Sequence, residues 1–246
     1  MGGQSGLLVA LSGIESAGKS TQLDLLVDGL RGQGVEPTLI WSRTGYTPGI
    51  GWLKKRLRTL KRRKKKPRGS IATEAGASPR RAANLGSPSK RFGWFLLASL
   101  DLLWIYGVRV RWLRSLGRTI ICDRYLLDAL VDLRLNFPDP GPAERFLRRL
   151  LLAAAAKPDV SACLLVSADE SDRRSRVKQR HHWETREMLQ RRIDEYRLVA
   201  DKLGVGILDG CLPVEQLAET IRKQVDTSSK TWGTKSVRDV SSLARH

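Results

Sequence analysis

A stretch near the amino terminus, SGIESAGKSTQ (residues 12–22), has the residue types that hold phosphates. Residues 13–20 fit the pattern G-x-x-x-x-G-K-[ST], in which glycines let the backbone wrap a phosphate and N–H groups at the next helix start point at it. We expect Lys19 to reach the β- and γ-phosphates of ATP and the Ser20 hydroxyl to ligate Mg²⁺. The predicted ATP-binding residues are Gly13, Glu15, Ser16, Ala17, Gly18, Lys19, Ser20 and Thr21.

A second motif, ICDRY (residues 121–125), ends an apolar run. A carboxylate at a strand end near a phosphate-binding loop commonly holds Mg²⁺ or its water shell, and Asp123 fits that role. A guanidinium forks onto phosphate oxygens, so Arg124 could bridge the donor and acceptor phosphates. Tyr125 is placed with the acceptor. The alternative is an ordinary strand-end turn with a surface ion pair.

A third element is basic and helical in pattern. The stretch DESDRRSRVKQR (169–180) would set Arg173, Arg176 and Arg180 on one face of a helix. Closing over ATP, such a helix would neutralise developing charge and exclude water, so these three arginines are candidate catalytic residues. The alternative is a solvated charged face.

Alternating strands and helices position these motifs. Short apolar runs ending in glycine or charged residues indicate buried parallel strands, and apolar residues at helical spacing indicate the helices between them. The expected strands are 6–13, 37–43, 118–125, 159–167 and 204–210. The expected helices are 19–32, 91–116, 141–156, 184–203 and one that begins at Pro213.

Five such strands predict an α/β fold with a parallel sheet. Ligands of these sheets bind outside the carboxyl ends of the strands, where the phosphate-binding loop, Arg43 and residues 123–125 all fall. The sequence therefore brings distant motifs to one edge of the sheet. We expect a kinase domain over residues 1–225, with a flexible insertion at about 54–91 and a loose tail at 226–246.

The formal net charge of +19 over 246 residues is concentrated in one segment. Residues 54–68 carry eleven basic residues and no acidic one, and the stretch that follows is rich in Gly, Ala, Ser and Pro. This segment could bind nucleic acid or an anionic membrane, or attract an anionic substrate. The other interpretation is a solubilising surface loop. No aromatic residues are interleaved for base stacking within it.

The remaining composition favours a cytoplasmic protein. Cys122, Cys163 and Cys211 are widely spaced and odd in number, which favours reduced thiols. No signal peptide is evident at the amino terminus. The longest apolar stretch, residues 92–107, is shorter than a bilayer requires and contains Asp101, so we interpret it as a buried helix and expect no transmembrane segment. Contact of this stretch with a membrane surface is the alternative.

The order of these motifs resembles the thymidylate kinase branch of the nucleoside monophosphate kinases. The resemblance rests on GIESAGKSTQ, CDRY, an arginine-rich segment and IDEYRLVA, and it spans roughly residues 6–225 without the insertion. It implies a five-stranded parallel sheet flanked by helices, often in a homodimer. It also implies transfer of the ATP γ-phosphoryl group to a monophosphate such as dTMP, in nucleotide biosynthesis. Some members supply their arginines from the lid, which agrees with Glu15 in the loop.

The chain departs from this family on the acceptor side. The family's Arg-Glu-Pro-Gly loop matches RTGYTPG here, which keeps Arg43 for an acceptor phosphate and replaces the glutamate with Thr44. The helical segment 95–104, FLLASLDLLW, has no basic residue. Phe95 or Trp104 could stack on a ring, and Asp101 would be the polar contact. Three functions stay open: a nucleotide kinase, a kinase of sugars or modified nucleotides, and a polyanion-binding protein with little turnover.

Overall fold

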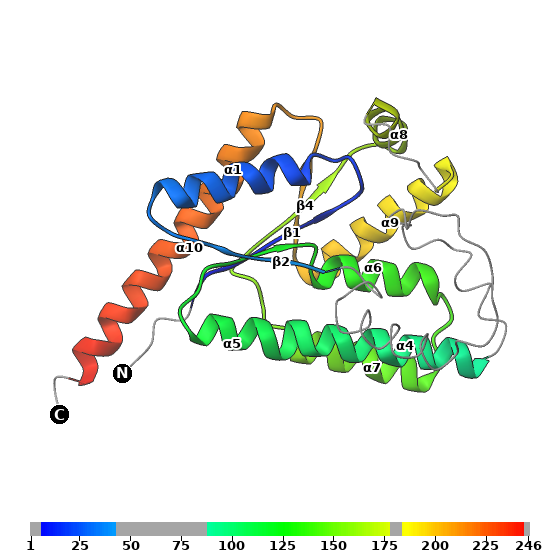
Figure 1. Ribbon diagram of the computed structural model, residues 1–246, viewed down its shortest axis with the longest axis horizontal. Helices are drawn as coiled ribbons and strands as arrows, with labels where there is room; N and C mark the ends of the chain where they lie inside the picture. Colours follow the sequence, from blue (N-terminus) through cyan, green and yellow to red (C-terminus); the bar gives the residue numbers. More distant parts are fainter. Residues whose placement is uncertain (1–5, 43–87, 178–183, 244–246) are drawn as a thin grey trace, which may run out of the picture.

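The computed structural model describes residues 6–42, 88–177 and 184–243, with side chains of the last helix described up to residue 228. Arg43, Arg180 and most of the predicted insertion at 54–91 lie outside these ranges. Within them the chain forms a single parallel sheet covered by helices on both faces (Figure 1).

The sheet has five parallel strands in the order β2-β3-β1-β4-β5, which confirms the predicted fold class. All five lie where the sequence predicts strands. The central β1 pairs with β3 on one side and β4 on the other, so its carboxyl end lies between theirs. The bounds are β1 Leu8–Gly13, β2 Thr38–Trp41, β3 Ile120–Asp123, β4 Val160–Leu165 and β5 Gly206–Asp209.

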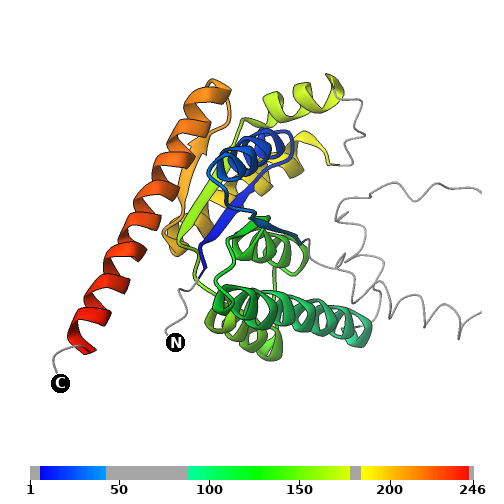
Figure 2. The same ribbon diagram turned by 60° about the vertical axis from the view of Figure 1, so that its left-hand side comes forward.

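Helices cover the two faces of the sheet in unequal numbers (Figures 1 and 2). Val9 and Leu11 of β1 pack with α1 and α10, whereas Leu8 and Ala10 face the opposite way, as the alternation of a strand requires. Most of the other helices lie on that second side, and the helix after β4 lies beyond the carboxyl end of the sheet (Figure 1). Their bounds are α1 Lys19–Gly32, α4 Pro88–Leu102, η1 Leu103–Arg109, α5 Val110–Ser115, α6 Leu126–Asn136, α7 Pro142–Ala154, α8 Ala168–Val177, α9 Arg186–Leu203 and α10 Val214–Leu243.

The structure differs from the sequence prediction in three helices. Helix α6, LLDALVDLRLN, is not among the predicted helices, and it is buried over seven consecutive residues, 127–133. The predicted helix at 91–116 is a continuous rod of α4, η1 and α5, whose central turn, η1, has π-helical hydrogen bonding. Helix α10 extends to Leu243 and so includes much of the segment 226–246 that we expected to be a loose tail.

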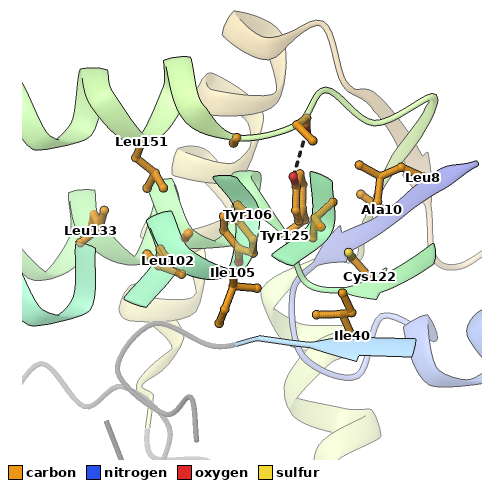
Figure 3. Packing of buried hydrophobic residues seen from close by; sticks show 14 of the residues in the cluster. Leu8, Ala10, Ile40, Leu102, Ile105, Tyr106, Cys122, Tyr125, Leu133 and Leu151 are labelled. Carbon is orange, nitrogen blue, oxygen red and sulfur yellow. Dashed lines mark hydrogen bonds between the residues drawn. The ribbon is translucent and has the colours of Figure 1, made fainter. Parts of the chain in front are cut away.

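Two tyrosines, Tyr106 and Tyr125, pack against each other in the core near the carboxyl end of β3 (Figure 3). The Tyr106 and Tyr125 rings lie 4.3 Å apart between centroids. Tyr125 Oη donates to Ala156 O at 2.8 Å, and the Tyr106 and Ser42 hydroxyls lie 2.5 Å apart. The core ties the ends of β2 and β3 to the helices beside them and fixes the backbone at the carboxyl edge of the sheet.

The rod formed by α4, η1 and α5 is apolar along most of its length. By length and composition alone, Arg91–Ser115 is suited to cross a membrane, with a mean hydropathy of 1.3 over its most apolar window, of which 39% is buried. Its inner side packs in the core through Phe95, Leu102 and Tyr106. A core helix passes the same test of length and composition, so the finding agrees with a helix that is buried on one side.

Candidate active site

The loop between β1 and α1 has the backbone of a phosphate cradle. Gly13 has φ 134° and Gly18 has φ 96°, and between them Ser16 has φ 59°. A Cβ added at Gly13 would lie 2.0 Å from Leu164 O, so both its conformation and its space require glycine. Helix α1 begins directly after Gly18, so its first N–H groups face the cradle.

The Lys19 side chain is folded into this loop. Its Nζ donates to Gly13 O at 2.9 Å and to Ile14 O at 2.5 Å, and the residue is only 8% exposed. Burial lowers the pKa of Lys19 to about 8, with the nearby Arg124 guanidinium as the second cause. The ammonium is therefore held inside the cradle, and it loses its proton near pH 8.

This lowered pKa predicts that ATP affinity depends on pH. As pH rises through 8, the free protein loses the Lys19 proton, whereas bound triphosphate favours the charged form and raises the pKa again. Binding should therefore take up a proton, and affinity should fall by up to about tenfold per pH unit above 8. Calorimetry at about pH 9 in two buffers of different ionisation heat measures the uptake.

The matched control is Lys19→Arg, whose guanidinium stays protonated over this range. We expect its ATP binding to show no proton uptake. Equal ATP affinity of the unmodified protein at pH 7 and at about pH 9 would contradict the prediction.

Arg124 lies beside the loop on a fixed backbone. Its N–H donates to Leu11 O at 2.9 Å, its carbonyl accepts from Ser42 Oγ at 3.2 Å, and its φ is 70°. One guanidinium nitrogen lies 3.4 Å from Asp128 Oδ1 and another lies 3.8 Å from Glu15 Oε1. The structure thus places Arg124 next to the predicted ATP loop, as the sequence suggested.

Asp128 joins the loop to the turn after β3 and was missed in the sequence. Its Oδ1 accepts from Tyr196 Oη at 2.7 Å and from Gly13 N at 3.4 Å, and its Oδ2 accepts from Tyr125 N at 3.2 Å. The residue is 3% exposed. Its position three residues after Tyr125, where an acidic side chain caps a helix start, was the available signal.

Asp123 and Ser20 were the residues predicted to hold Mg²⁺, and each follows or ends an element at the carboxyl edge of the sheet. Asp123 ends β3 and is partly buried, and burial raises its pKa while Lys19 and Arg124 oppose that shift. Ser20 and Thr21 are exposed on the first turn of α1. No cluster of three His, Cys, Asp or Glu residues is found in the described ranges. A hydroxyl and a carboxylate completed by phosphate oxygens and water suit Mg²⁺, which rarely uses an all-protein cage.

Helix α8 is docked on the loop by residues other than the predicted arginines. Ser175 Oγ lies 2.6 Å from Ser16 Oγ, and Ser171 Oγ donates to Glu15 O at 2.9 Å. Arg174 donates to Gly210 O at 2.9 Å and to Ser16 O at 3.5 Å. The sequence analysis missed these three residues, although two serines at a spacing of four, both on one face of the basic helix, were a signal.

The predicted lid arginines lie on the outside of α8. Arg173 pairs with Glu170 and Arg176 pairs with Asp172, and their side chains are 66% and 79% exposed. Neither contacts the loop through any hydrogen bond found among the described residues. Their catalytic role remains a prediction, as does that of Arg180.

We therefore expect Arg174→Ala to weaken ATP binding more than Arg173→Ala. The first change removes the hydrogen bonds that tie α8 to Ser16 and to the end of β5, whereas the second removes one exposed ion pair with Glu170. The loss should be about 5- to 20-fold in Kd for Arg174→Ala and less than about twofold for Arg173→Ala. Titration with a non-hydrolysable ATP analogue measures both. A larger loss for Arg173→Ala would show that the outer arginine turns inward on the ligand.

Of the predicted acceptor residues, Phe95 and Tyr125 lie in the core, whereas Asp101 and Trp104 are at least partly exposed. Phe95 is 0% exposed and its ring packs edge-on against Phe137, and Tyr125 is likewise buried in the core, so neither presents a ring face in this conformation. Asp101 is half-buried, and burial raises its pKa to about 6. Trp104 is 61% exposed. The acceptor roles of these residues stay predictions.

No family model matches the chain, and no curated protein matches its sequence. Among solved structures, the chain is similar to a thymidylate kinase from Candida albicans, which is described as having broad substrate specificity and a novel structural element. The two are 17% identical, the match covers 92% of this chain and 93% of that one, and the TM-score is 0.56. The similarity extends over nearly the whole of both chains, and it shows that this chain has the fold of a P-loop kinase.

Proposed function

We propose that this protein is an ATP-dependent phosphotransferase that moves the γ-phosphoryl group of ATP to dTMP or a related nucleoside monophosphate. The observation that carries the proposal is the meeting of two predicted motifs at the carboxyl edge of the sheet. Lys19 lies inside the loop, and Arg124 lies beside it, 3.8 Å from Glu15. A cation inside the donor site and a second cation at its edge suit transfer between two phosphates.

A phosphate acceptor needs no general base, because its oxygen is already a nucleophile. Positioning and neutralisation of charge then account for catalysis. The described site offers cations in Lys19, Arg124 and Arg174, and no histidine or cysteine takes part in the side-chain hydrogen bonds found for the loop among the described residues. Arg124 would hold the transferred group between donor and acceptor, and Asp128 would hold Arg124.

ATP and Mg²⁺ are the cofactors that these residues fit. The loop N–H groups and Lys19 would hold the triphosphate, and Ser20 with Asp123 would hold the cation, which neutralises charge on the phosphates. The half-buried Asp123 carboxylate lies near two cationic side chains, and these favour its ionised form.

A second candidate is a kinase of a hydroxyl-bearing acceptor such as a sugar. It is favoured by the acceptor side: Phe95 is buried, segment 95–104 has no basic residue, and burial raises the pKa of Asp101 to about 6. A carboxylate with a pKa in that range is suited to accept a hydroxyl proton near neutral pH. This candidate keeps the donor site unchanged and differs only in the acceptor.

The test is a screen of acceptors with the purified full chain, ATP and Mg²⁺. Nucleoside monophosphates, including dTMP, and a set of sugars are supplied singly, and phosphorylated products are identified by mass spectrometry. We expect dTDP or another nucleoside diphosphate, with activity lost in Lys19→Ala. Absence of any nucleoside diphosphate overturns the first proposal, and a sugar phosphate whose rate rises with an apparent pKa near 6 supports the second.

A further inference from the structure

An apolar stripe runs along the outside of the rod formed by α4, η1 and α5. It consists of six residues spaced three or four apart, which places them on one side of a helix. We name this stripe the outer helical face. Its members and their exposed fractions are Leu97 41%, Leu100 50%, Trp104 61%, Val108 49%, Trp112 61% and Leu116 55%.

The opposite side of the rod is fixed in the protein core. Phe95, Leu102 and Val110 are 0% exposed and belong to the cluster that packs on the sheet. The rod therefore lies along the protein with its outer helical face uncovered among the described residues, and Figure 2 shows it at the margin of the molecule. Apolar surface of this extent on a folded domain commonly marks an interaction site.

The side chains that border this face are mainly basic, and few are acidic. Arg109, Arg111 and Arg118 are exposed along its second half, and the only acidic residue between positions 91 and 118 is the half-buried Asp101. The neighbouring α7 also exposes an aromatic ring, Phe146 at 63%. The surface combines apolar anchors with positive charge, on a chain whose net charge is +19.

We propose that the outer helical face rests on an anionic lipid bilayer as a peripheral contact. Trp104 and Trp112 are of the residue type that settles at the level of the headgroups, with leucine and valine reaching the acyl boundary. Arginines at the edge of such a surface meet anionic headgroups while their stems cover apolar area. The inference is independent of the acceptor chemistry proposed above.

The positive charge of this surface favours an anionic bilayer over a second copy of the chain or a nucleic acid. A second copy would bring a surface with the same sign of charge, in which Asp101 is the only acidic residue between positions 91 and 118. A nucleic acid would satisfy the arginines and leave six apolar side chains without apolar partners. An anionic bilayer satisfies both parts of the surface.

The experiment is flotation of the full chain with vesicles of phosphatidylcholine alone or with about 30% phosphatidylserine. We expect binding to the anionic vesicles only, weakened by about tenfold or more in the double variant Trp104→Ser/Trp112→Ser. The matched control is Leu25→Ser/Leu198→Ser, which removes side chains of 42% and 41% exposure on α1 and α9, and we expect it to bind unchanged. If the tryptophan variant fails to fold by circular dichroism, Leu100→Ser/Val108→Ser takes its place.

Four results would overturn the proposal. The first is no binding to anionic vesicles. The second is binding that the double variant leaves unchanged, which would assign the attraction to charge elsewhere in the chain. The third is a dimer in analytical ultracentrifugation that the double variant dissociates while vesicle binding persists, which would assign the face to a second copy. A chain lacking residues 54–68 should keep weaker binding that is still sensitive to the tryptophan replacement, and complete loss would also contradict the proposal.

Discussion

Replacing Lys19 with alanine is expected to lower the rate of phosphoryl transfer by about 10²–10³-fold with whichever acceptor the protein uses. The side chain is the cation inside the cradle, where its Nζ lies 2.9 Å from Gly13 O, and the change leaves the γ-phosphoryl charge without that partner. Burial makes the missing charge more effective than an exposed lysine would be. A steady-state assay with saturating acceptor gives kcat and KM for ATP separately.

The matched control for this prediction is Lys202→Ala, which removes an exposed lysine on α9. We expect its kcat to stay within about twofold of the unmodified protein, because a surface charge outside the site contributes little. Lys19→Arg should retain part of the activity, since it keeps the charge and changes its reach. A Lys19→Ala variant with nearly full kcat would show that the loop does not hold the reacting phosphate.

The second large effect is expected on stability. Asp128→Ala should lower the free energy of unfolding by about 3–5 kcal/mol, because it leaves a buried cation without its close partner. The change removes the acceptor for Tyr196 Oη and Tyr125 N, and of the two ion pairs found for Arg124 among the described residues it leaves the one with the half-exposed Glu15 carboxylate at 3.8 Å. Urea unfolding followed by circular dichroism measures the loss.

Asp194→Ala is the matched control, since its carboxylate is 59% exposed and pairs with Arg197 at 3.9 Å. Its free energy of unfolding should change by no more than about 0.5 kcal/mol. Asp128→Asn keeps the shape and some hydrogen bonds, so it should fall between the two. Equal stability of Asp128→Ala and the control would mean that the tyrosine and arginine find new partners by local rearrangement.

The strands and the donor loop were predictable because their patterns are local. Each strand is a short apolar run with a clear end, and the glycines at 13 and 18 stand where the chain needs positive φ. The carboxyl-edge rule then placed Arg124 beside the loop without any structural information. Helix α6 was not predicted, because seven of its residues are buried in succession and leave no amphipathic stripe to recognise.

The contacts of α8 and the acceptor side were harder to predict, because both depend on how helices rotate in the fold. The spacing of Arg173 and Arg176 selects the most basic face, but the helix docks through Ser171, Ser175 and Arg174. Phe95 was chosen as a ring that could stack on a ligand, yet the rod turns it into the core. Helix rotation follows from packing with distant residues, which a pattern within one segment does not contain.

The hydrogen bonds of Lys19 to the carbonyls of its own loop have a consequence for how nucleotide enters. These bonds close the loop around a cation of its own chain, which favours a defined shape for the loop. A bound triphosphate would exchange these two hydrogen bonds for contacts to its phosphate oxygens and would order little new backbone. Such pre-organisation favours fast capture with a small entropy of ordering. In the proposed function the lysine would thus have two roles, since it would both shape the loop and bind the ATP phosphates.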